Sequence, residues 1–520
     1  MGVQDITNPL FRDKSSASVI TAALLSSSVV VLVVAFFRFL RSRSSSQRFI
    51  AENNCKPAPA WPQKDPFFAL DFILEGFRHF RQKTYLDLWR KYYADLGPTF
   101  TLRMRGVQYV NTIDPENIKT ILASRFHDYS LSERVEIMGP LLGRGIFVTD
   151  GDEWAHSRAL LRPNFAKDHV ADLGMIDRHF GDLMALLRPH AAAGSAVDLQ
   201  PLFMRLTLDT ATEFLFNKST RTLSLEHARP AEHAFGDAFQ LSLDEMGLVL
   251  RLGPFRWLRR QSREITDAHK LCRAYVDRFV DEAWALKQGG KKTDNRTYFL
   301  KELVESTNNK DKVRDELLNI LIAGRDTVAS LLGSLLRVLS QRPEIWAKVR
   351  AEVAQFEGKL PRYDQLRNLK YAKYCINEAL RLWPAVPLNS RLAVRETVLP
   401  RGGGPNGDDP VYVPKGGLVN YSVYAMHRRT DFFGADAGEF RPERWEGQIY
   451  SWQYLPFNGG PRICLGQQYA LTEMLVVLVR FAQEFSHIES RDPTPWQEEL
   501  HLTVRPANGV LVALTLAKPA

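Results

Sequence analysis

One cysteine near the C-terminus lies in a setting that favours metal chemistry. Cys464 stands in a short loop with three glycines, with Arg462 two residues before it and a helix-like segment from Gln467 to Ala482 after it. Glycine permits tight turns and a close approach of the backbone to a flat ligand. Amides at the start of the following helix favour a thiolate over a thiol. Such a thiolate can ligate one face of a haem iron and favour O–O cleavage on the other face.

The loop Phe457-Asn-Gly-Gly-Pro-Arg462-Ile-Cys464-Leu-Gly466 resembles the haem loop of the cytochrome P-450 family. The alternative is that Cys464 is an inert buried thiol, a common state of free cysteines. Three further segments resemble the same family in the same order, and independent motif matches in context favour the haem loop. The resemblance implies haem b as the cofactor, the Cys464 thiolate as the metal ligand, and cofactor contacts from Phe457, Arg462 and Gly466.

The second segment lies in a long apolar helix pattern and resembles the oxygen-activating motif of that family. It reads Ala323-Gly324-Arg325-Asp326-Thr327. Glycine in a helix interior costs about 1 kcal/mol relative to alanine, so Gly324 needs a local reason. The resemblance assigns proton delivery to Thr327, whose hydroxyl can hold a water, and to Asp326, whose carboxylate can relay protons from bulk solvent. On its own, the pair would be read as an ordinary polar face or a helix kink.

The third segment places Glu378 and Arg381 three residues apart on a helix pattern, so that they face the same side. Such a pair is common on surfaces and contributes little there. Downstream, the sequence around Pro442 and Arg444 resembles a second element of the family, whose arginine joins the pair. The resemblance implies that Glu378, Arg381 and Arg444 form a buried structural clamp for the cysteine loop.

The fourth segment carries Trp154 and Arg158 at a four-residue spacing, which places both on one helix face. Indole and guanidinium groups both donate hydrogen bonds, which suits a carboxylate. The resemblance implies that Trp154, Arg158, Arg391 and Arg462 contact the haem, with the arginines at its propionates. The alternative for each arginine is an ordinary surface position.

The substrate is predicted from a narrower resemblance. Residues 390–434, with the polar turn that begins at Arg401, resemble the fungal and yeast alkane- and fatty-acid-hydroxylating subgroup. This implies a haem-thiolate monooxygenase that hydroxylates a lipophilic substrate at or near a terminal methyl group, using dioxygen and reductase-supplied electrons. Candidate pocket residues are Ala323, Val386 and Leu388. The rival substrate is a secondary metabolite, such as a polyketide or terpenoid with an alkyl tail.

Two other functions remain open. An isomerase or dehydratase of preoxidised lipids would keep the fold but would need no dioxygen, and the Asp326–Thr327 pair argues against it. A membrane-anchored haem sensor or carrier would show no turnover and would give that pair no purpose. The GxGxxG spelling at 402–407 lies in the polar turn, so the chain has no GxGxxG nucleotide-binding unit, and it has no spare length for a flavin domain. The implied electron donor is therefore a membrane-bound NADPH-cytochrome P-450 reductase. We expect no nucleic-acid partner.

Charge and hydropathy predict a membrane anchor. The run from Ser15 to Phe37 is uncharged and apolar, and a helix that crosses a bilayer needs roughly 20 such residues. Residues 38–64 then hold six Lys or Arg and one acid, within a chain of net charge +9. Positive flanks stay in the cytosol. We therefore expect a single-pass endoplasmic reticulum protein with a cytosolic catalytic body; an amphipathic or mobile tail is the alternative.

The remaining composition predicts one large domain. Four cysteines without CxxC or His clusters argue against disulfides and structural zinc and fit a reducing compartment. Periodicity predicts a mainly α body with a small β-sheet region, the fold that the family resemblance also implies. The predicted organisation is a membrane anchor and basic flank over 1–45, a proline-containing hinge over 46–65, and the haem-thiolate monooxygenase domain over 66–520. Predicted helices cover 80–94, 116–124, 152–163, 197–216, 262–286, 311–341, 343–356 and 370–383, and predicted strands cover 99–103, 107–113, 392–398, 411–413 and 510–516.

Overall fold

The computed structural model describes residues 27, 41, 43–131, 133–165, 172–224, 230–289 and 299–518. The predicted membrane span from Ser15 to Phe37 therefore lies, apart from Ser27, outside the described residues. Among the residues that are described, no helix combines the length and the apolar character that a bilayer crossing needs.

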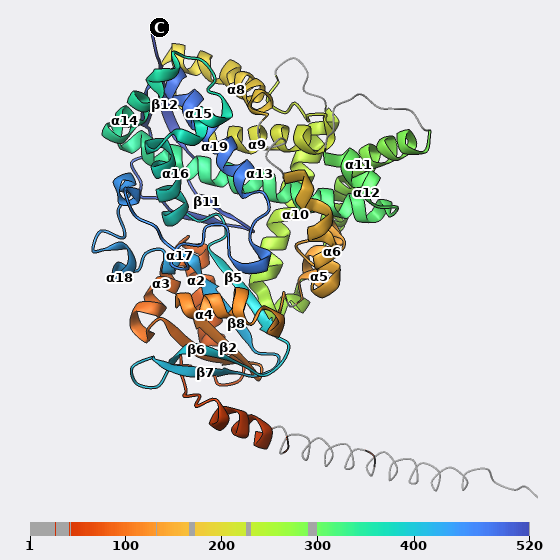
Figure 1. Ribbon diagram of the computed structural model, residues 1–520, viewed down its shortest axis with the longest axis vertical. Helices are drawn as coiled ribbons and strands as arrows, with labels where there is room; N and C mark the ends of the chain where they lie inside the picture. The colour runs from red at the N-terminus through yellow and green to blue at the C-terminus, as the bar shows by residue number, and fades with distance from the viewer. Residues whose placement is uncertain are drawn as a thin grey trace, which may run out of the picture.

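The body is mainly helical with small β regions, as predicted from the sequence. Most helices gather in one part of the body, and the largest sheet forms the other part (Figure 1). The longer helices are α2 (Leu70–Arg81), α3 (Tyr85–Leu96), α5 (Arg134–Leu142), α6 (Gly151–Leu161), α8 (Leu173–Ala193), α9 (Leu199–Phe216), α10 (Pro230–Leu252), α11 (Arg263–Gln288), α12 (Phe299–Ser306), α13 (Lys310–Gln341), α14 (Pro343–Val353), α16 (Tyr371–Leu382) and α19 (Gln467–Glu484). Short helices are α4 (Pro115–Lys119), α15 (Tyr363–Asn368), α17 (Val423–Met426) and α18 (Thr430–Phe433).

The largest sheet has five strands in the order β1-β2-β8-β5-β3. β2 and β8 run parallel, with Val110 opposite Val419, and the other neighbours are antiparallel. The polar turn at 404–408 connects the antiparallel strands β6 and β7, as predicted. The strands are β1 (Thr99–Met104), β2 (Val107–Thr112), β3 (Tyr129–Ser130), β4 (Val197–Asp198), β5 (Leu388–Ala393), β6 (Thr397–Gly403), β7 (Asp409–Val413), β8 (Leu418–Ser422), β9 (Phe485–Ser490), β10 (Glu498–Leu500), β11 (Val504–Pro506) and β12 (Leu511–Leu516).

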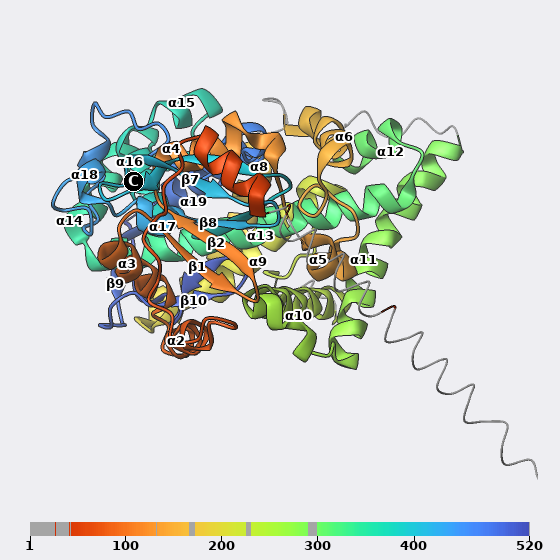
Figure 2. The same cartoon turned by 90° about the horizontal axis from the view of Figure 1, so that it is seen from below.

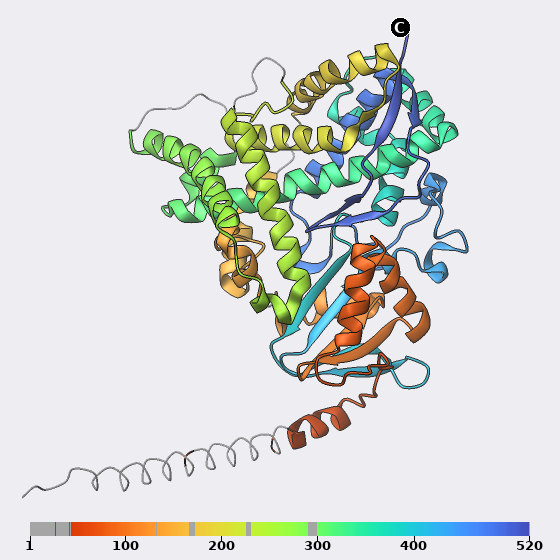
Figure 3. The ribbon, with the colours of Figure 1, turned by 180° about the vertical axis from the view of Figure 1, so that it is seen from behind.

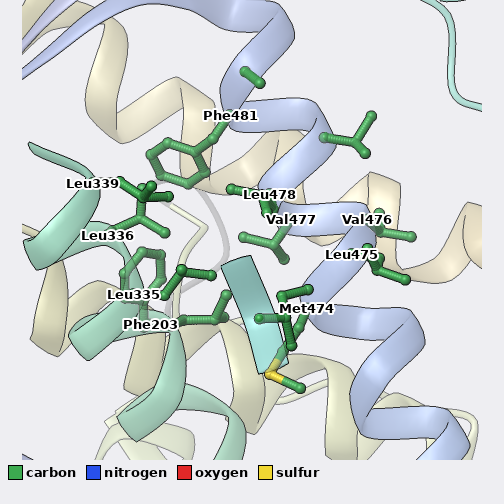
Figure 4. Close-up of a cluster of buried hydrophobic side chains, with 14 of the residues drawn as sticks. Phe203, Leu335, Leu336, Leu339, Met474, Leu475, Val476, Val477, Leu478 and Phe481 are labelled. Atoms are coloured by element: carbon green, nitrogen blue, oxygen red, sulfur yellow. The ribbon is translucent and has the colours of Figure 1, made fainter. Parts of the chain in front are cut away.

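The helix α13 runs through the middle of the helical part, and most of its residues are buried. Its C-terminal half packs against α9 and α19 in one continuous apolar cluster (Figure 4). Phe203 of α9, Leu335 of α13 and Leu478 of α19 are all fully buried there. Burying one such side chain contributes about 1.5–3 kcal/mol. Because α19 begins directly after the Cys464 loop, this cluster fixes the loop relative to α13.

Local breaks correct two sequence predictions. The predicted helix over 80–94 is two helices, because the chain turns at 82–84, where Lys83 has a φ of 58°. The predicted strand over 392–398 is interrupted by a bend between β5 and β6. Within the predicted hinge, Trp61 is buried and its backbone N–H donates to the carbonyl of Thr101 at 2.8 Å. This part of the segment is therefore docked on β1.

The helix α10 connects the two parts of the body. Seen from behind, it runs from the helical part towards the sheet, and its C-terminal end reaches the neighbourhood of α2 (Figure 3). The view from below shows α2 at the edge of the molecule, on the same side as α10 (Figure 2). The short 3-10 segment η5 (Gly253–Leu258) follows α10 directly.

Candidate active site

The Cys464 loop is held in a tight backbone arrangement. The N–H of Cys464 donates to the carbonyl of Phe457, and the N–H of Ile463 donates to the carbonyl of Gly460, each at 3.0 Å. Gly460 has a φ of 67°, and a Cβ at this position would lie 1.9 Å from the carbonyl oxygen of Leu122. No other residue type fits there without moving the backbone, which gives the glycine a specific packing role.

Cys464 is exposed at the surface of the protein. Many protein atoms nevertheless surround its sulfur, and they reduce its solvation. This burial raises the pKa of the Cys464 thiol, while the N–H of Gly466 and the charge of Arg158 oppose the rise. The sequence argument relied on amides at the start of α19. These amides lower the pKa of the thiol as predicted, but burial raises it by more. Further positive charge beside the sulfur is needed to keep it deprotonated at neutral pH, and a bound iron would supply that charge.

One buried carboxylate organises the segment before the loop. Glu378 on α16 accepts two hydrogen bonds from Arg381, at 2.7 and 2.9 Å. It also accepts from Arg444 Nε at 3.2 Å, from the Trp445 indole at 3.0 Å and from the Arg441 backbone N–H at 3.1 Å. Glu378 and Arg381 are completely buried. The three residues that the sequence grouped as a clamp therefore meet around a single carboxylate.

His427 connects this clamp to the cysteine loop, and the sequence analysis did not identify it. Its Nε2 accepts the backbone N–H of Leu455 at 2.9 Å, so its Nδ1 carries the proton and donates to the carbonyl of Arg381 at 3.2 Å. Arg381 Nη1 in turn donates to the carbonyl of His427 at 2.8 Å. Leu455 lies two residues before Phe457, which binds the N–H of Cys464. Burial lowers the pKa of His427 to about 3, with the charge of Arg381 acting in the same direction.

Arginine side chains crowd beside the loop. Arg462 donates to Asp150 at 2.7 Å, and its guanidinium lies 4.4 Å from the ring centre of Trp154. Arg391 and Arg134 both donate to the side-chain oxygen of Asn389, at 3.1 and 2.7 Å. Burial, together with the charge of Arg391, lowers the pKa of Arg134 and Arg462 to about 10 each. Asp150 pairs with Arg462, but no described carboxylate forms an ion pair with Arg134 or Arg391.

Arg134 is a member of this cluster that the sequence analysis missed. It is the first residue of α5, where no family motif was recognised. Arg158, by contrast, lies on the sulfur side of the cluster, because its guanidinium donates to the carbonyl of Ile463 at 3.0 Å. The predicted set Trp154, Arg158 and Arg462 is therefore brought together, and Arg391 joins it from β5.

The predicted proton-delivery residues lie on α13. The hydroxyl of Thr327 donates to the carbonyl of Ala323 at 2.7 Å, a local bond that leaves its oxygen lone pairs free to accept. Asp326 is buried and pairs with Arg325 at 3.1 Å. Burial raises the pKa of the Asp326 carboxyl, and the charge of Arg325 opposes the rise. Gly324 faces Ala211 of α9, and its lack of a side chain allows α9 to pack closely against α13.

The N-terminal half of α13 holds the loop at 143–147 by side chains that the sequence analysis did not connect. Asn319 accepts the N–H of Phe147 at 3.0 Å and donates to the carbonyl of Leu142 at 3.0 Å. A Cβ on Gly145 would lie 2.1 Å from the Asn319 amide. Three residues further along, Thr149 and Asp150 accept bonds from Arg462. The loop therefore links α13 to the cysteine loop. In the sequence, Gly143 and Gly145 were the available sign of this close approach.

The pocket candidates come from two separated segments, with the β10–β11 hairpin between them. The hydroxyl of Ser330 on α13 donates to the carbonyl of Val504, and the N–H of Val504 donates to the carbonyl of Ala385 at 3.1 Å. These bonds bring the β10–β11 hairpin between α13, which carries Ala323, and the segment that carries Val386 and Leu388. Val386 is 43% exposed and Leu388 is half-buried, so apolar surface remains beside the hairpin.

Comparisons with known proteins agree with this geometry. A family model described as Cytochrome P450 matches residues 63–513. The chain is 54% identical over 504 residues to the protein named Cytochrome P450 monooxygenase himC of Aspergillus japonicus, which covers 96% of this chain and 90% of the relative. It is 53% identical over 486 residues to Cytochrome P450 monooxygenase fsdH of Fusarium heterosporum, with 90% and 85% covered. It is 38% identical over 498 residues to Cytochrome P450 52A13 of Debaryomyces hansenii, with 92% and 95% covered.

The chain belongs to the cytochrome P450 family and is a monooxygenase of that family. Its cofactor is the thiolate-ligated haem b that the family uses. The residues present fit this group, because the propionates would supply the carboxylate partners that Arg134 and Arg391 lack among the described residues, and Arg462 lies beside them. No described side chain crowds Gly466, where a Cβ would make only ordinary contact with Phe165. A flat ring therefore has open backbone to lie against.

The close approach at Gly460 generates a prediction. In Gly460→Ala, the new Cβ must displace the Leu122 carbonyl, so the loop moves and haem content per folded protein falls by about half or more. Gly447→Ala is the matched control, because Gly447 has the same φ of 67° but no atom within 4 Å. The measurement is haem absorbance relative to protein concentration. Equal haem content in both variants would mean that the approach to Leu122 has no role.

The low pKa of His427 predicts an acid-sensitive clamp. The unfolded chain protonates this side chain below about pH 6.5, whereas the folded protein does so only near pH 3. Stability is therefore fully present above pH 6.5, and His427 removes up to about 1.4 kcal/mol for each pH unit below it. In His427→Gln, we expect lower stability at neutral pH but a flatter dependence between pH 6.5 and 5. Denaturant unfolding at each pH measures this, with the exposed His487→Gln as control; parallel curves for both variants would contradict it.

Proposed function

We propose that this monooxygenase hydroxylates a lipophilic specialised metabolite that carries an extended alkyl part, such as a polyketide or terpenoid. One observation supports this substrate class: relatives from Aspergillus and Fusarium are 53–54% identical. Yeast relatives of the 52 series, the alkane- and fatty-acid-hydroxylating subgroup, are 38–42% identical. Terminal hydroxylation of a long-chain fatty acid or alkane is the second candidate, favoured by the resemblance of residues 390–434.

In this proposal, Cys464 is the iron ligand. Haem b with a thiolate ligand supplies the chemistry that activates dioxygen and inserts one of its atoms into a C–H bond. Trp154, Arg391, Arg462 and the added Arg134 hold the propionates, while Phe457 and Gly466 shape the loop against the ring. Glu378, Arg381 and Arg444 keep this loop in place and take no part in the chemistry.

Proton delivery falls to Asp326 and Thr327. Burial raises the pKa of the Asp326 carboxyl, which makes this group a better proton acceptor than an exposed carboxylate. The Thr327 hydroxyl, oriented by its bond to the Ala323 carbonyl, offers its oxygen to a water on the pocket side. The two residues are adjacent on α13 and would pass protons from Asp326 to that water.

Electrons come from a redox partner, as in other members of the family. The proposed donor is NADPH-cytochrome P-450 reductase, docked on the face that carries the cysteine loop. A cleft of about 320 Å³ opens there, lined by Trp452, Asn458 and Ile463 among others. Ile463, next to the proposed ligand, is 39% exposed. Arg162 adds an exposed positive charge directly after α6, the helix that carries Arg158.

The proposed location is the endoplasmic reticulum membrane, with the catalytic body in the cytosol. Leu70, Leu74 and Phe77 lie on one face of α2, and all are largely exposed. Phe67 and Trp257 are also exposed, at 72% and 70%. Large exposed apolar patches mark interaction surfaces, and Trp suits a membrane interface. This face and the predicted anchor at Ser15–Phe37 would contact the same bilayer.

A ligand screen tests the substrate class. The full chain, in membranes with reductase, is titrated with alkyl-bearing polyketides and terpenoids, long-chain fatty acids and alkanes, and spectral shifts and products are recorded. The proposal predicts the highest kcat/KM within the first group. Highest kcat/KM for a fatty acid or alkane would instead establish the second candidate.

The proposed proton route predicts a variant that binds haem and substrate normally but forms little product. In Asp326→Asn, the carboxamide cannot release a proton, so product formation falls by roughly 100-fold while haem content and substrate affinity hold. Asp311→Asn is the matched control, because Asp311 lies on the same helix with its side chain 76% exposed. Product formed per NADPH consumed is the measurement. An unchanged ratio in Asp326→Asn would remove this residue from the route.

A further inference from the structure

The last turn of α10 carries a cation that the catalytic account does not use. Arg251 donates from Nη1 to the carbonyl of His501 at 3.0 Å, and its guanidinium lies 4.4 Å from the ring centre of Phe80 on α2. Its Nε is buried and has no hydrogen-bond partner. Within the described part of the chain, Arg251 forms no ion pair. A half-buried guanidinium with only a neutral acceptor retains unsatisfied donors and charge.

The acids near Arg251 are already occupied. Asp244, two turns earlier on α10, pairs with His501 Nδ1 at 2.9 Å. Glu499 on β10 pairs with Arg505 at 2.5 Å. Burial lowers the pKa of Arg251 to about 10, and the Tyr85 phenol and the charge of Asp244 oppose this only in part. An external anion is therefore the partner that this side chain lacks.

Arg251 lies between the exposed apolar face and the hairpin that reaches α13. Phe80 belongs to α2, which carries the exposed residues Leu74 and Phe77. On the other side, His501 is three residues from Val504, which contacts Ser330 of α13. Three residues of extended chain span at most about 10 Å. A molecule with one end at Arg251 and an alkyl body along the hairpin would therefore reach the α13 surface.

The backbone of α10 also lies unusually close to this hairpin. A Cβ on Gly247 would lie 2.8 Å from the carbonyl carbon of His501. Together with the Asp244–His501 pair, this contact fixes Arg251 relative to the hairpin tip, so the cation is held in place before any ligand arrives. A preorganised cation loses little on binding.

We propose that Arg251 is an anion subsite that binds the carboxylate of an amphipathic substrate whose alkyl part extends towards α13. This deepens the proposed function, since it takes an alkyl-bearing substrate as given and adds an acidic head group to it. The guanidinium fork supplies the donors at Nε and Nη2, and the Phe80 ring excludes water from one face. A carboxylate anchored here would also fix which carbon of the chain reaches the pocket.

The test compares ligands that differ only in their head group. A long-chain fatty acid, its alcohol and its methyl ester are titrated into the detergent-solubilised haem protein, and spectral shifts and calorimetry give the dissociation constants. We expect wild type to prefer the acid, and Arg251→Gln to weaken acid binding about tenfold, as for a lost hydrogen bond to a charged group, with the alcohol unchanged. Arg251→Lys should retain part of the preference. Arg259→Gln is the matched control, because Arg259 already pairs with Glu245 at 2.8 Å.

The remaining outcomes of this test distinguish the anion subsite from the proposed function and from a role in membrane binding. Equal affinity of wild type for acid, alcohol and ester would overturn the subsite and leave the alkyl substrate standing. Failure of all three to bind would overturn the subsite, while the screen of polyketides and terpenoids decides the proposed function separately. The second source of an anion is a lipid head group, so binding to phosphatidylcholine vesicles with and without phosphatidylserine is measured as well. Loss of phosphatidylserine binding in Arg251→Gln with unchanged acid affinity would assign Arg251 to the membrane and overturn the substrate role.

Discussion

The site depends on one buried carboxylate. Glu378 accepts five hydrogen bonds from Arg381, Arg444, Trp445 and Arg441, and these donors come from segments that are far apart in sequence. Loss of one partner of a buried ion pair costs about 3–5 kcal/mol, because the other charge stays buried. His427 carries this constraint onward to Leu455 and thus to the loop that presents Cys464.

A second constraint fixes the position of the Cys464 loop relative to α13. The apolar cluster of α9, α13 and α19 fixes the helix after Cys464 against the helix that carries Asp326 and Thr327. The segment 142–150 adds a polar link, since Asn319 of α13 bonds to Leu142 and Phe147 and Arg462 of the cysteine loop bonds to Thr149 and Asp150. The site is thus positioned by contacts from both sides, one apolar and one polar.

Much of the site was predictable because its motifs are local. The Cys464 loop, the Glu378–Arg381 pair and the Asp326–Thr327 pair each lie within a few residues, so each could be recognised as a short motif and interpreted through the family resemblance. Arg134, His427 and Asn319 were not predictable in this way, because their partners lie tens to hundreds of residues away. The burial of Trp61 depends on its contact with β1, which lies far away in sequence. The break at Lys83 is a left-handed turn with local hydrogen bonds, which hydrophobic periodicity does not indicate.

The most direct test of the account is the carbon monoxide spectrum of the reduced full-length protein, because the band position reports the ligand opposite the carbon monoxide. With Cys464 as the thiolate ligand, the account predicts the strongly red-shifted Soret band of a thiolate-ligated haem, and loss of that band in Cys464→His with haem retained. An unshifted band in the folded wild-type protein, or a red-shifted band that survives in Cys464→His, would contradict it.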